Sequence, residues 1–408
     1  MPGLRRREDC RDPAWLRAQL SAILDFWYPA AVDRRNGGFL NLLDADGSVL
    51  DAEQKHLVAS ARFAVLFSMG ALSGTGGDWC RQAAADAVDF LWRAHRDPVH
   101  GGYFWVLRGD QPVDRRKQSY GHAFVVLAGA VAHRAGVSGA QRLLEDAVDV
   151  VERQFFRGGD LALNTASEDF GEVTTYRGQN PNMHLCEAFI AAFEATGHPP
   201  YLDRAYRIAD VLVRQVTTRI GGFVWENFDA AWRPDWERRP RDRASIEAAS
   251  GVVPGHQIEW AKLLGILARH RDADWLLPEA VHLYRLGWDF GWDRNHGGFY
   301  NGLGRDMTVE DPRPSYWSPS EAIGGAAVLA VATGNPDYWA DYEKAWDYAL
   351  TNLVDQEHGG WFKVPSPAGA REDGRKGDGL DPDYHPAGAC FEALRCLEMA
   401  NSAGAQAP

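Results

Sequence analysis

The chain has 408 residues, of which 45% are hydrophobic, and its 43 Lys and Arg against 56 Asp and Glu give a net charge of −13. This negative charge disfavours nucleic acid and anionic membrane surfaces as partners, because both carry negative charge themselves. No apolar stretch approaches the roughly 20 residues of a membrane span, and no apolar core of a secretory signal is present, so we expect a cytoplasmic protein. The five cysteines, with no CxxC pair, are typical of free thiols in a reducing compartment.

Glycine pairs recur along the whole chain. Successive pairs lie 57 to 76 residues apart, and five of the six are followed at once by an aromatic residue. A near-constant period over the full length indicates one supersecondary unit repeated six times, and therefore a single domain spanning 1–408. The pairs are Gly37-Gly38, Gly101-Gly102, Gly158-Gly159, Gly221-Gly222, Gly297-Gly298 and Gly359-Gly360.

Each repeat contains, in chain order, a glycine–aromatic turn, a short hairpin, an apolar helix and an amphipathic helix. Turn signals such as Asp-Gly, flanked by alternating apolar residues, predict the hairpins. Helices that are apolar on nearly every face are expected to be buried, whereas helices with one apolar stripe are expected to lie outside them. The predicted buried helices span 57–72, 120–135, 182–196, 255–269, 319–333 and 386–400.

Six buried helices alternating with six amphipathic helices predict an all-α fold, an (α/α)6 barrel with short β-hairpins in its loops. An open α-solenoid is the alternative, but six units commonly close a ring and the buried helices are very apolar, so closure is favoured. A charged segment at 229–251 accounts for the widest spacing between glycine pairs. It is either a lid or a plain insertion.

A polar or ionisable residue stands near the start of every predicted buried helix. These residues are 60 to 72 positions apart and therefore follow the repeat. The starts of the inner helices of a barrel face one mouth, so we expect the six side chains to converge on one cavity. A single helix histidine is usually a packed core or surface residue, but four in register favour a functional site. The six are Arg62, His122, His184, His256, Glu321 and His385.

Two of the histidines belong to His-x-x-Glu pairs, His184 with Glu187 and His256 with Glu259. Residues three apart share one face of a helix, so each carboxylate can hold one ring nitrogen and raise the basicity of the other. The pattern also occurs in carboxylate-bridged metal sites, but those need further carboxylates, and only Glu321 is in register. We therefore expect no metal. Cofactor motifs are missing as well, including GxGxxG, a phosphate loop and a zinc-type cysteine pair.

Three further candidates lie beside the in-register residues. Trp317 directly precedes the fifth buried helix, where it either packs or stacks on a sugar. Asn180 and Asn182 stand where a helix cap is expected. Capping explains one of the two, and the other could bind hydroxyl groups.

The motifs around these residues resemble those of the N-acylglucosamine 2-epimerase superfamily of sugar isomerases and epimerases, over about residues 15–400. Within that superfamily, the segments around His184 and His256 are most similar to the aldose–ketose isomerase branch, which includes mannose isomerases. The matching segments are SARFAVLF (Arg62), YGHAF (Tyr120, His122), NPNMHLCEA (Asn180, His184, Glu187), PGHQIEWAKLL (His256, Glu259), YWSPSEAI (Trp317, Glu321) and DYHPAGACFE (His385).

The resemblance implies metal-free proton transfer on an open-chain aldose bound at the mouth of an (α/α)6 barrel. Moving a proton from C2 to C1 needs a base that is active near neutral pH, a role suited to histidine, and a cation beside the enediolate oxygen, which Arg62 can supply. We expect His385 to move the C2 proton through a cis-enediol, and His256, held by Glu259, to assist ring opening. The expected substrate is a neutral monosaccharide of the D-mannose/D-fructose type, because the sequence shows no phosphate clamp.

Other functions stay open on the sequence. A 2-epimerase, acting on a free sugar, an N-acyl sugar or a disaccharide, would use both histidines at C2 from opposite faces. A barrel-shaped glycoside hydrolase or lyase is a weaker alternative, because hydrolysis needs two facing carboxylic acids. A non-catalytic sugar-binding protein would not need histidines with orienting carboxylates. The sequence does not decide the exact sugar or whether the protein is a monomer or a homodimer.

Overall fold

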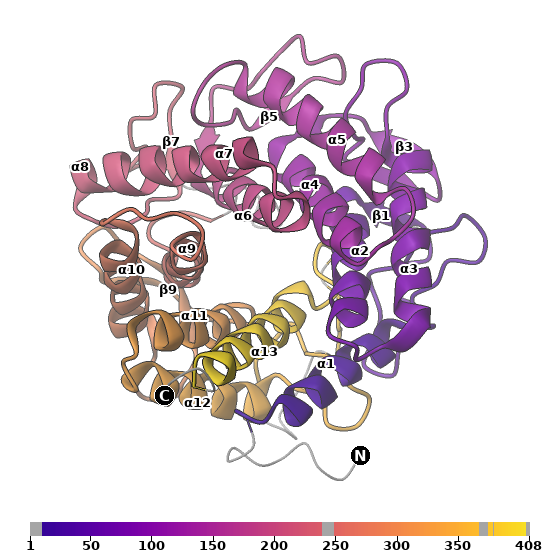
Figure 1. The fold of residues 1–408 in the computed structure, drawn as a ribbon. Coiled ribbons are helices and arrows are strands. Elements are labelled where there is room, and N and C mark those ends of the chain that lie inside the picture. The colour runs from indigo at the N-terminus through magenta and orange to yellow at the C-terminus, as the bar shows by residue number, and fades with distance from the viewer. Residues whose placement is uncertain (1–9, 239–248, 367–373, 378, 405–408) are drawn as a thin grey trace.

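The computed structural model describes residues 10–238, 249–366, 374–377 and 379–404, which form a closed ring of two helical layers (Figure 1). The inner layer consists of α2 (Leu57–Leu72), α4 (Ser119–Arg134), α6 (Gln179–Thr196), α9 (Pro254–Leu267), α11 (Ser318–Thr333) and α13 (Tyr384–Gly404). The outer layer consists of α1 (Pro13–Trp27), α3 (Gly77–Phe90), α5 (Ala140–Val150), α7 (Pro199–Ala209), α10 (Leu276–Gly291) and α12 (Asp337–Asn352). Helix α13 packs against both α1 and α2 and so closes the ring. The predicted (α/α)6 barrel is confirmed, and the open solenoid is wrong.

The two layers differ in burial as their sequences predict. No residue of α2 is exposed, because this helix is enclosed by its inner neighbours and by the outer ring. The outer helix α5 instead buries residues three or four apart and exposes the opposite face, as an amphipathic helix does. Its buried residues include Ala140, Leu143, Leu144 and Ala147. Burial of the apolar stripe holds each outer helix on the ring.

Three outer helices continue beyond their α-helical part. The continuations are π-helical: η2 (Leu91–His95), η3 (Val151–Phe156) and η4 (Asp210–Thr217), the last followed by α8 (Thr218–Ile220). Each continuation leads directly to the next glycine pair. The outer helix and the glycine turn therefore form one unit in these repeats.

The strands are short and lie between the helices, as predicted. Two antiparallel pairs are hairpins within one repeat, β2 (Val106–Arg108) with β3 (Gln111–Asp114) and β8 (Phe299–Leu303) with β9 (Val309–Ser315). The other pairs join loops of successive repeats, because these loops crowd together at one end of the barrel. They are β1 (Gln54–His56) with β2, β4 (Lys117–Gln118) with β5 (Thr165–Ala166), and β6 (Arg177–Gly178) with β7 (Asn227–Phe228).

A recurring turn explains four of the six glycine pairs. In each, an aspartate four residues before the first glycine accepts hydrogen bonds from two backbone N–H groups, as Asp33 does from Arg35 and Asn36. Both glycines then have positive φ, 79° at Gly37 and 70° at Gly38, a conformation that other residues adopt at a cost. In three of these turns a buried lysine pairs with the aspartate: Lys55 with Asp33, Lys117 with Asp97 and Lys376 with Asp355.

Helix α6 begins at Gln179, three residues before the predicted start, and the residue at its N-cap position is Gly178. Neither Asn180 nor Asn182 is therefore the cap, because both lie inside the helix. The lid hypothesis for 229–251 falls largely on residues 239–248, which lie outside the described residues.

Candidate active site

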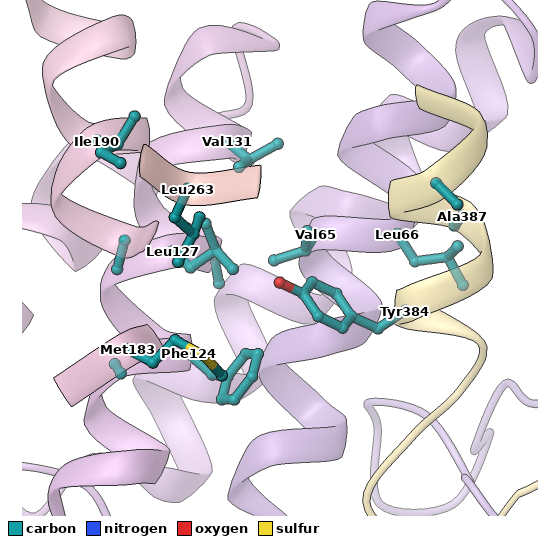
Figure 2. Packing of buried hydrophobic residues seen from close by; sticks show 14 of the residues in the cluster. Val65, Leu66, Phe124, Leu127, Val131, Met183, Ile190, Leu263, Tyr384 and Ala387 are labelled. Atoms are coloured by element: carbon teal, nitrogen blue, oxygen red, sulfur yellow. The ribbon is translucent and has the colours of Figure 1, made fainter. Parts of the chain in front are cut away.

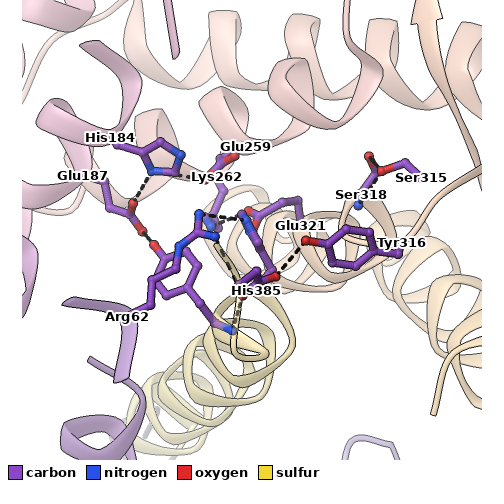
Figure 3. Close-up of polar contacts among 12 residues, drawn as sticks. Arg62, His184, Glu187, Glu259, Lys262, Ser315, Tyr316, Ser318, Glu321 and His385 are labelled. Carbon is purple, nitrogen blue, oxygen red and sulfur yellow. Dashed lines mark hydrogen bonds and ion pairs between the residues drawn. The ribbon is translucent and has the colours of Figure 1, made fainter. Parts of the chain in front are cut away.

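Side chains from the first turns of the inner helices meet at one end of the barrel (Figure 3). Five of the six in-register residues belong to this group, and each is buried, with at most 7% of its surface exposed: Arg62, His184, His256, Glu321 and His385. They lie on five different inner helices. These five side chains therefore lie close together, as the register predicts, and their role in binding or catalysis stays a prediction.

His385 is held by a carboxylate from the neighbouring helix. Its Nδ1 lies 2.7 Å from Glu321 Oε1, and its Nε2 lies 3.4 Å from Arg62 Nη2. A carboxylate accepts and a guanidinium only donates, so both contacts require the tautomer with the proton on Nδ1. The other oxygen of Glu321 contacts the Lys262 ammonium. Burial alone would raise the pKa of Glu321, but the charge of Lys262 and the bond to His385 lower it to about 2.

Arg62 is fixed between aromatic rings and polar groups. Its guanidinium lies over the rings of Phe124 and Tyr384, 4.3 and 4.7 Å from their centroids. It donates to Tyr120 Oη at 3.3 Å, and it lies 3.8 Å from Asp381. Burial would lower the pKa of Arg62, but Tyr120 and Asp381 raise it above its usual range. Arg62 is therefore a permanent cation next to His385.

The structure corrects the predicted partner of His256. Its Nδ1 lies 2.7 Å from Glu226 Oε1, and Glu259 makes no bond to it. Residues three apart share a helix face, but Nδ1 of His256 is directed across the barrel wall toward the β6–β7 pair, where Glu226 stands just before β7. Gln179 also lies beside this nitrogen, with its Nε2 3.0 Å away. The His-x-x-Glu interpretation is therefore wrong for His256.

The second His-x-x-Glu pair forms as predicted. His184 Nδ1 lies 2.9 Å from Glu187 Oε2, and the Tyr384 hydroxyl donates to Glu187 Oε1 at 2.5 Å. Burial lowers the pKa of His184 to about 4, so the ring is neutral near pH 7. Burial would raise the pKa of Glu187, but the bond from His184 lowers it. His184 therefore donates through Nδ1, and its Nε2 has no proton.

Glu259 is the exception among the buried carboxyl groups. It is fully buried, and neither of its oxygens has a hydrogen-bond partner. Burial, together with the charges of Glu321 and Glu187, raises the pKa of Glu259 well above its usual range. The side chain is therefore a neutral carboxylic acid near pH 7, with a proton to donate.

Trp317 connects the two histidines that are expected to be catalytic. Its half-buried ring lies 4.9 Å from the His256 ring and 5.4 Å from the His385 ring, measured between centroids. Gly255 makes this position possible, because a Cβ there would lie only 2.5 Å from the Trp317 ring. The indole therefore forms a flat apolar wall beside both imidazoles.

His122 does not belong to the group. Its Nε2 accepts from Tyr103 N at 3.0 Å, and its Nδ1 lies 2.7 Å from Gln118 O. The ring packs on Phe155 and Phe170, between the two helical layers. Both nitrogens are used by backbone groups, so the predicted sugar-binding role of His122 is not supported by its contacts.

The two asparagines of α6 also differ. Asn182 accepts from Ala162 N at 2.8 Å and donates to Gly178 O at 3.2 Å, so it fastens a loop to the helix. Asn180 has a buried Oδ1 without a hydrogen-bond partner. Only Asn180 therefore keeps a polar atom available for a ligand.

Within the site, two groups of buried or half-buried side chains have the composition of a metal site. They are His184 with Glu187 and Glu259, and Glu259 with Glu321 and His385. In the first, Glu187 already accepts from His184 and Tyr384. In the second, the Lys262 ammonium already contacts Glu321 and supplies the positive charge. Both observations favour the predicted metal-free site.

A cavity of about 90 Å³ extends from this end along the barrel axis. Lys262, Glu321 and His385 line one end of it, and Glu194, Glu392 and Arg395 line the other. Its middle is apolar, with walls that include Leu127, Val131, Ile190 and Leu263 (Figure 2). His385 borders this cavity, whereas Arg62, His256 and Trp317 do not line it.

Sequence reasoning missed several site residues, of which Glu226 is the most important. It stands four residues after a glycine pair, where the other repeats have Leu42, Val106, Leu163, Gly302 and Val364. A charged residue at an otherwise uncharged repeat position was the available signal. Tyr384 directly precedes His385 and Lys262 stands three residues after Glu259, but no periodicity marked either of them. No sequence pattern pointed to Gln179, because the predicted helix began three residues after it, at residue 182.

The comparisons with known proteins agree with this geometry. Residues 37–389 match the family model described as N-acylglucosamine 2-epimerase. The chain belongs to this family. This N-acylglucosamine 2-epimerase family member is 35% identical over 387 residues to the D-mannose isomerase of Marinomonas mediterranea, covering 94% of this chain and 98% of that one. The family assignment made from the motifs is confirmed, and the protein is an enzyme of a sugar-converting family.

Solved structures place the family member in the same group. A D-mannose isomerase crystal structure superposes with a TM-score of 0.89 at 34% identity, covering 94% of this chain and 98% of that one. A more distant relative is the cellobiose 2-epimerase of Bacteroides fragilis, 23% identical over 91% of this chain and 95% of its own. The family therefore contains both reaction types that the sequence left open.

Proposed function

We propose that this enzyme is a metal-independent aldose–ketose isomerase that interconverts D-mannose and D-fructose. The observation that supports it best is the pair formed by His385 and Arg62, an imidazole whose Nε2 lies 3.4 Å from a permanent cation. That pair is what a proton transfer next to a carbonyl requires. The similarity to D-mannose isomerases over nearly the whole chain supports the choice of sugar.

His385 is the proposed base. Its Nε2 takes the C2 proton of the open-chain aldose and returns it to C1 on the same face, through a cis-enediol. Glu321, which bonds Nδ1 at 2.7 Å, stabilises the imidazolium that forms in between. Arg62 stabilises the negative charge that develops on the enediolate oxygen, as preorganised cations do.

His256 is the proposed acid–base group for ring opening. Its ring lies beside the same Trp317 indole as the ring of His385, and Glu226 takes the orienting role that the sequence suggested for Glu259. His256 moves the proton between O5 and the aldehyde oxygen. The two histidines thus divide the reaction, one at the ring oxygen and one at the carbons.

The remaining residues form the proposed sugar-binding site. Trp317 offers its ring to an apolar face of the sugar. Glu259, as a neutral acid, donates to a hydroxyl group, and Asn180 and Tyr120 supply further polar atoms. His184 presents Nε2, while Glu187 fixes its ring. No lysine or arginine of the described residues is left over beside this group for a phosphate, because Arg62 and Lys262 pair with Asp381 and Glu321.

A 2-epimerase acting on a related sugar is the second candidate. One observation favours it. The rings of His256 and His385 both pack against the Trp317 indole, and each Nδ1 is bonded to a carboxylate of its own, from Glu226 and Glu321 respectively. Epimerisation removes a proton from one face of C2 and adds one to the opposite face, so it requires two histidines that can each act as a base. The family relationship to a cellobiose 2-epimerase agrees with this alternative.

Location and assembly stay predictions. None of the helices in the described residues is long and apolar enough to cross a membrane. The cytoplasmic location is proposed from the sequence argument alone, and the assembly is proposed only as monomer or homodimer.

Carbon NMR of D-mannose incubated with the enzyme in deuterium oxide tests the proposal. Fructose as the main product supports the isomerase, and deuterium at its C1 would show that the proton on His385 exchanges with solvent before it is returned. Glucose without fructose means epimerisation at C2 and gives both histidines the role of base. No change in mannose contradicts the proposed substrate, and N-acyl sugars and disaccharides are then the next to test.

A further inference from the structure

We infer that Gln179, held by Trp260, is a positioning residue that keeps Glu226 directed at His256, so that His256 presents an unprotonated Nε2 to the sugar. The contacts that support this are independent of the reaction. Its expected effect on turnover rests on the proposed function.

The backbone places Gln179 opposite Glu226. In the β6–β7 pair, Arg177 stands opposite Phe228 and Gly178 opposite Asn227. The register continues by one residue, because Gln179 N donates to Glu226 O at 3.2 Å. Antiparallel partners lie close enough for their side chains to meet. The two side chains are thus brought together by the strand pair, from successive repeats and 47 residues apart in the sequence.

Trp260 fixes which way the Gln179 amide points. His256 and Trp260 are four residues apart on α9 and so lie one above the other on one face. The Trp260 indole donates through Nε1 to Gln179 Oε1 at 2.8 Å. An indole N–H can only donate, so the oxygen of the amide must face Trp260. The amide NH₂ then faces Glu226, with its nitrogen 3.0 and 3.2 Å from the two carboxylate oxygens.

The tautomer of His256 follows from these contacts. Its Nδ1 lies 2.7 Å from a carboxylate oxygen and 3.0 Å from the Gln179 nitrogen. The two contacts favour opposite tautomers, since the carboxylate accepts a proton donor whereas the amide NH₂ donates. The Gln179 N–H groups are taken up by Glu226, and a hydrogen bond to a carboxylate is the stronger of the two. Nδ1 therefore carries the proton, and Nε2 is left as the base.

Glu226 depends on this arrangement because its other partners are neutral. Among the described residues, no lysine or arginine pairs with it, whereas Glu321 has Lys262. Glu226 is 2% exposed, and both Gln179 and Trp260 are fully buried. A buried carboxylate needs donors to stay charged. Without Gln179, Glu226 would keep only His256 as a side-chain donor among the residues that the structure describes.

Four variants test the inference. Glu226→Gln removes the charge, Gln179→Leu removes the donor, and Trp260→Phe removes the N–H that anchors the amide. Trp346→Phe is the matched control, because Trp346 is also fully buried but lies on the outer helix α12. Nitrogen NMR of histidine-labelled enzyme reports the tautomer of His256, whose signals are assigned by their loss in His256→Asn.

We expect the wild type to have the proton on Nδ1. In Glu226→Gln the population with the proton on Nε2 should rise, and kcat should fall about 100- to 10,000-fold with KM changed by less than about threefold, as in a triad whose carboxylate becomes an amide. Gln179→Leu and Trp260→Phe should lose about tenfold in kcat, which corresponds to about 1.4 kcal/mol in the barrier. Trp346→Phe should match the wild type.

Two results would overturn the inference: a wild-type His256 protonated on Nε2, or an unchanged tautomer and kcat in both Glu226→Gln and Trp260→Phe. If Glu226→Gln does not fold, the tautomer and kcat of the two milder variants decide. If the wild type does not convert mannose, the proposed function fails, while the nitrogen signals still decide the role of Gln179.

Discussion

Lys262 pairs with Glu321 of the neighbouring inner helix, although Glu259 lies three residues before it on its own helix. One ammonium thus faces several buried carboxyl groups, and they respond differently. The charge of Lys262 lowers the pKa of Glu321 to about 2, whereas burial raises that of Glu259 well above its usual range. Closely spaced buried carboxyl groups cannot all be ionised. Near pH 7, Glu321 is therefore an anion and Glu259 a neutral acid.

The same substitution at Glu259 and Glu321 should therefore change the stability of the protein by very different amounts. Glu259→Gln replaces a neutral acid by a neutral amide, so we expect the free energy of unfolding to change by less than about 1 kcal/mol. Glu321→Gln leaves the buried Lys262 without its partner, and we expect a loss of about 3 kcal/mol. Urea denaturation of both variants measures the difference. Equal losses would show that Glu259 is ionised as well.

Substitution of the proposed catalytic histidines should separate activity from stability. His256→Ala and His385→Ala should each lower kcat by about 100- to 10,000-fold, while unfolding stays cooperative, because both lie in the site. His122→Ala should do the reverse, since it loses two backbone hydrogen bonds in the core. Kinetics with mannose and calorimetry check all three. Loss of cooperative unfolding in both catalytic variants would refute the assignment.

Stability should fall in weak acid, because several histidines are buried in neutral form. Burial lowers the pKa of His56 and His122 to about 3 and of His95 and His184 to about 4. Between about pH 6.5 and 4 the unfolded chain binds protons that the native state does not, so falling pH destabilises the native state. Each histidine adds a slope of up to about 1.4 kcal/mol per pH unit.

Carboxyl groups modify this profile. The lowered pKa of Glu321 should add a further loss only below about pH 4.5, and the raised pKa of Glu259 acts in the opposite sense. Urea denaturation between pH 8 and 5 tests the histidine contribution, with His122→Gln as a variant that cannot take up the proton. A free energy of unfolding that is constant from pH 7 to 5 would contradict it.

Two helical glycines should respond oppositely to alanine. Gly388 on α13 lines the axial cavity, and a Cβ there would meet no atom within 4 Å. Gly388→Ala should stabilise the protein by about 0.5–1 kcal/mol, because alanine loses less chain entropy in a helix. At Gly129 on α4 a Cβ would lie 2.7 Å from Leu144 N, so Gly129→Ala should destabilise by about 1–3 kcal/mol. Thermal unfolding of both variants decides, and a destabilised Gly388→Ala would show that the cavity is needed.

Removal of divalent metals should not affect the reaction. Dialysis against EDTA is expected to leave kcat unchanged, because Lys262 already provides the positive charge in the second carboxylate group. Activity that disappears on dialysis and returns only with a divalent ion would show that Glu259 and Glu321 bind that ion.

The sequence alone determined the barrel and most of the site. The glycine pairs repeat because each aspartate-containing turn must join an outer helix to the next inner one, and burial on all sides marks the inner helices. These are local requirements, so they are visible in the order of residues. The in-register positions followed from the same repeat, and five of the six meet as predicted.

Only the tertiary structure decided which way each side chain points and which carboxylate it meets. Successive residues of a helix point about 100° apart, so Tyr120 contacts Arg62 while His122, two residues later, faces the outer layer. His256 meets Glu226 and Gln179 through a strand pair that joins two repeats, and His385 meets Glu321 from a different helix. Spacing along one helix cannot show such partners, because they are set by the packing of separate chain segments.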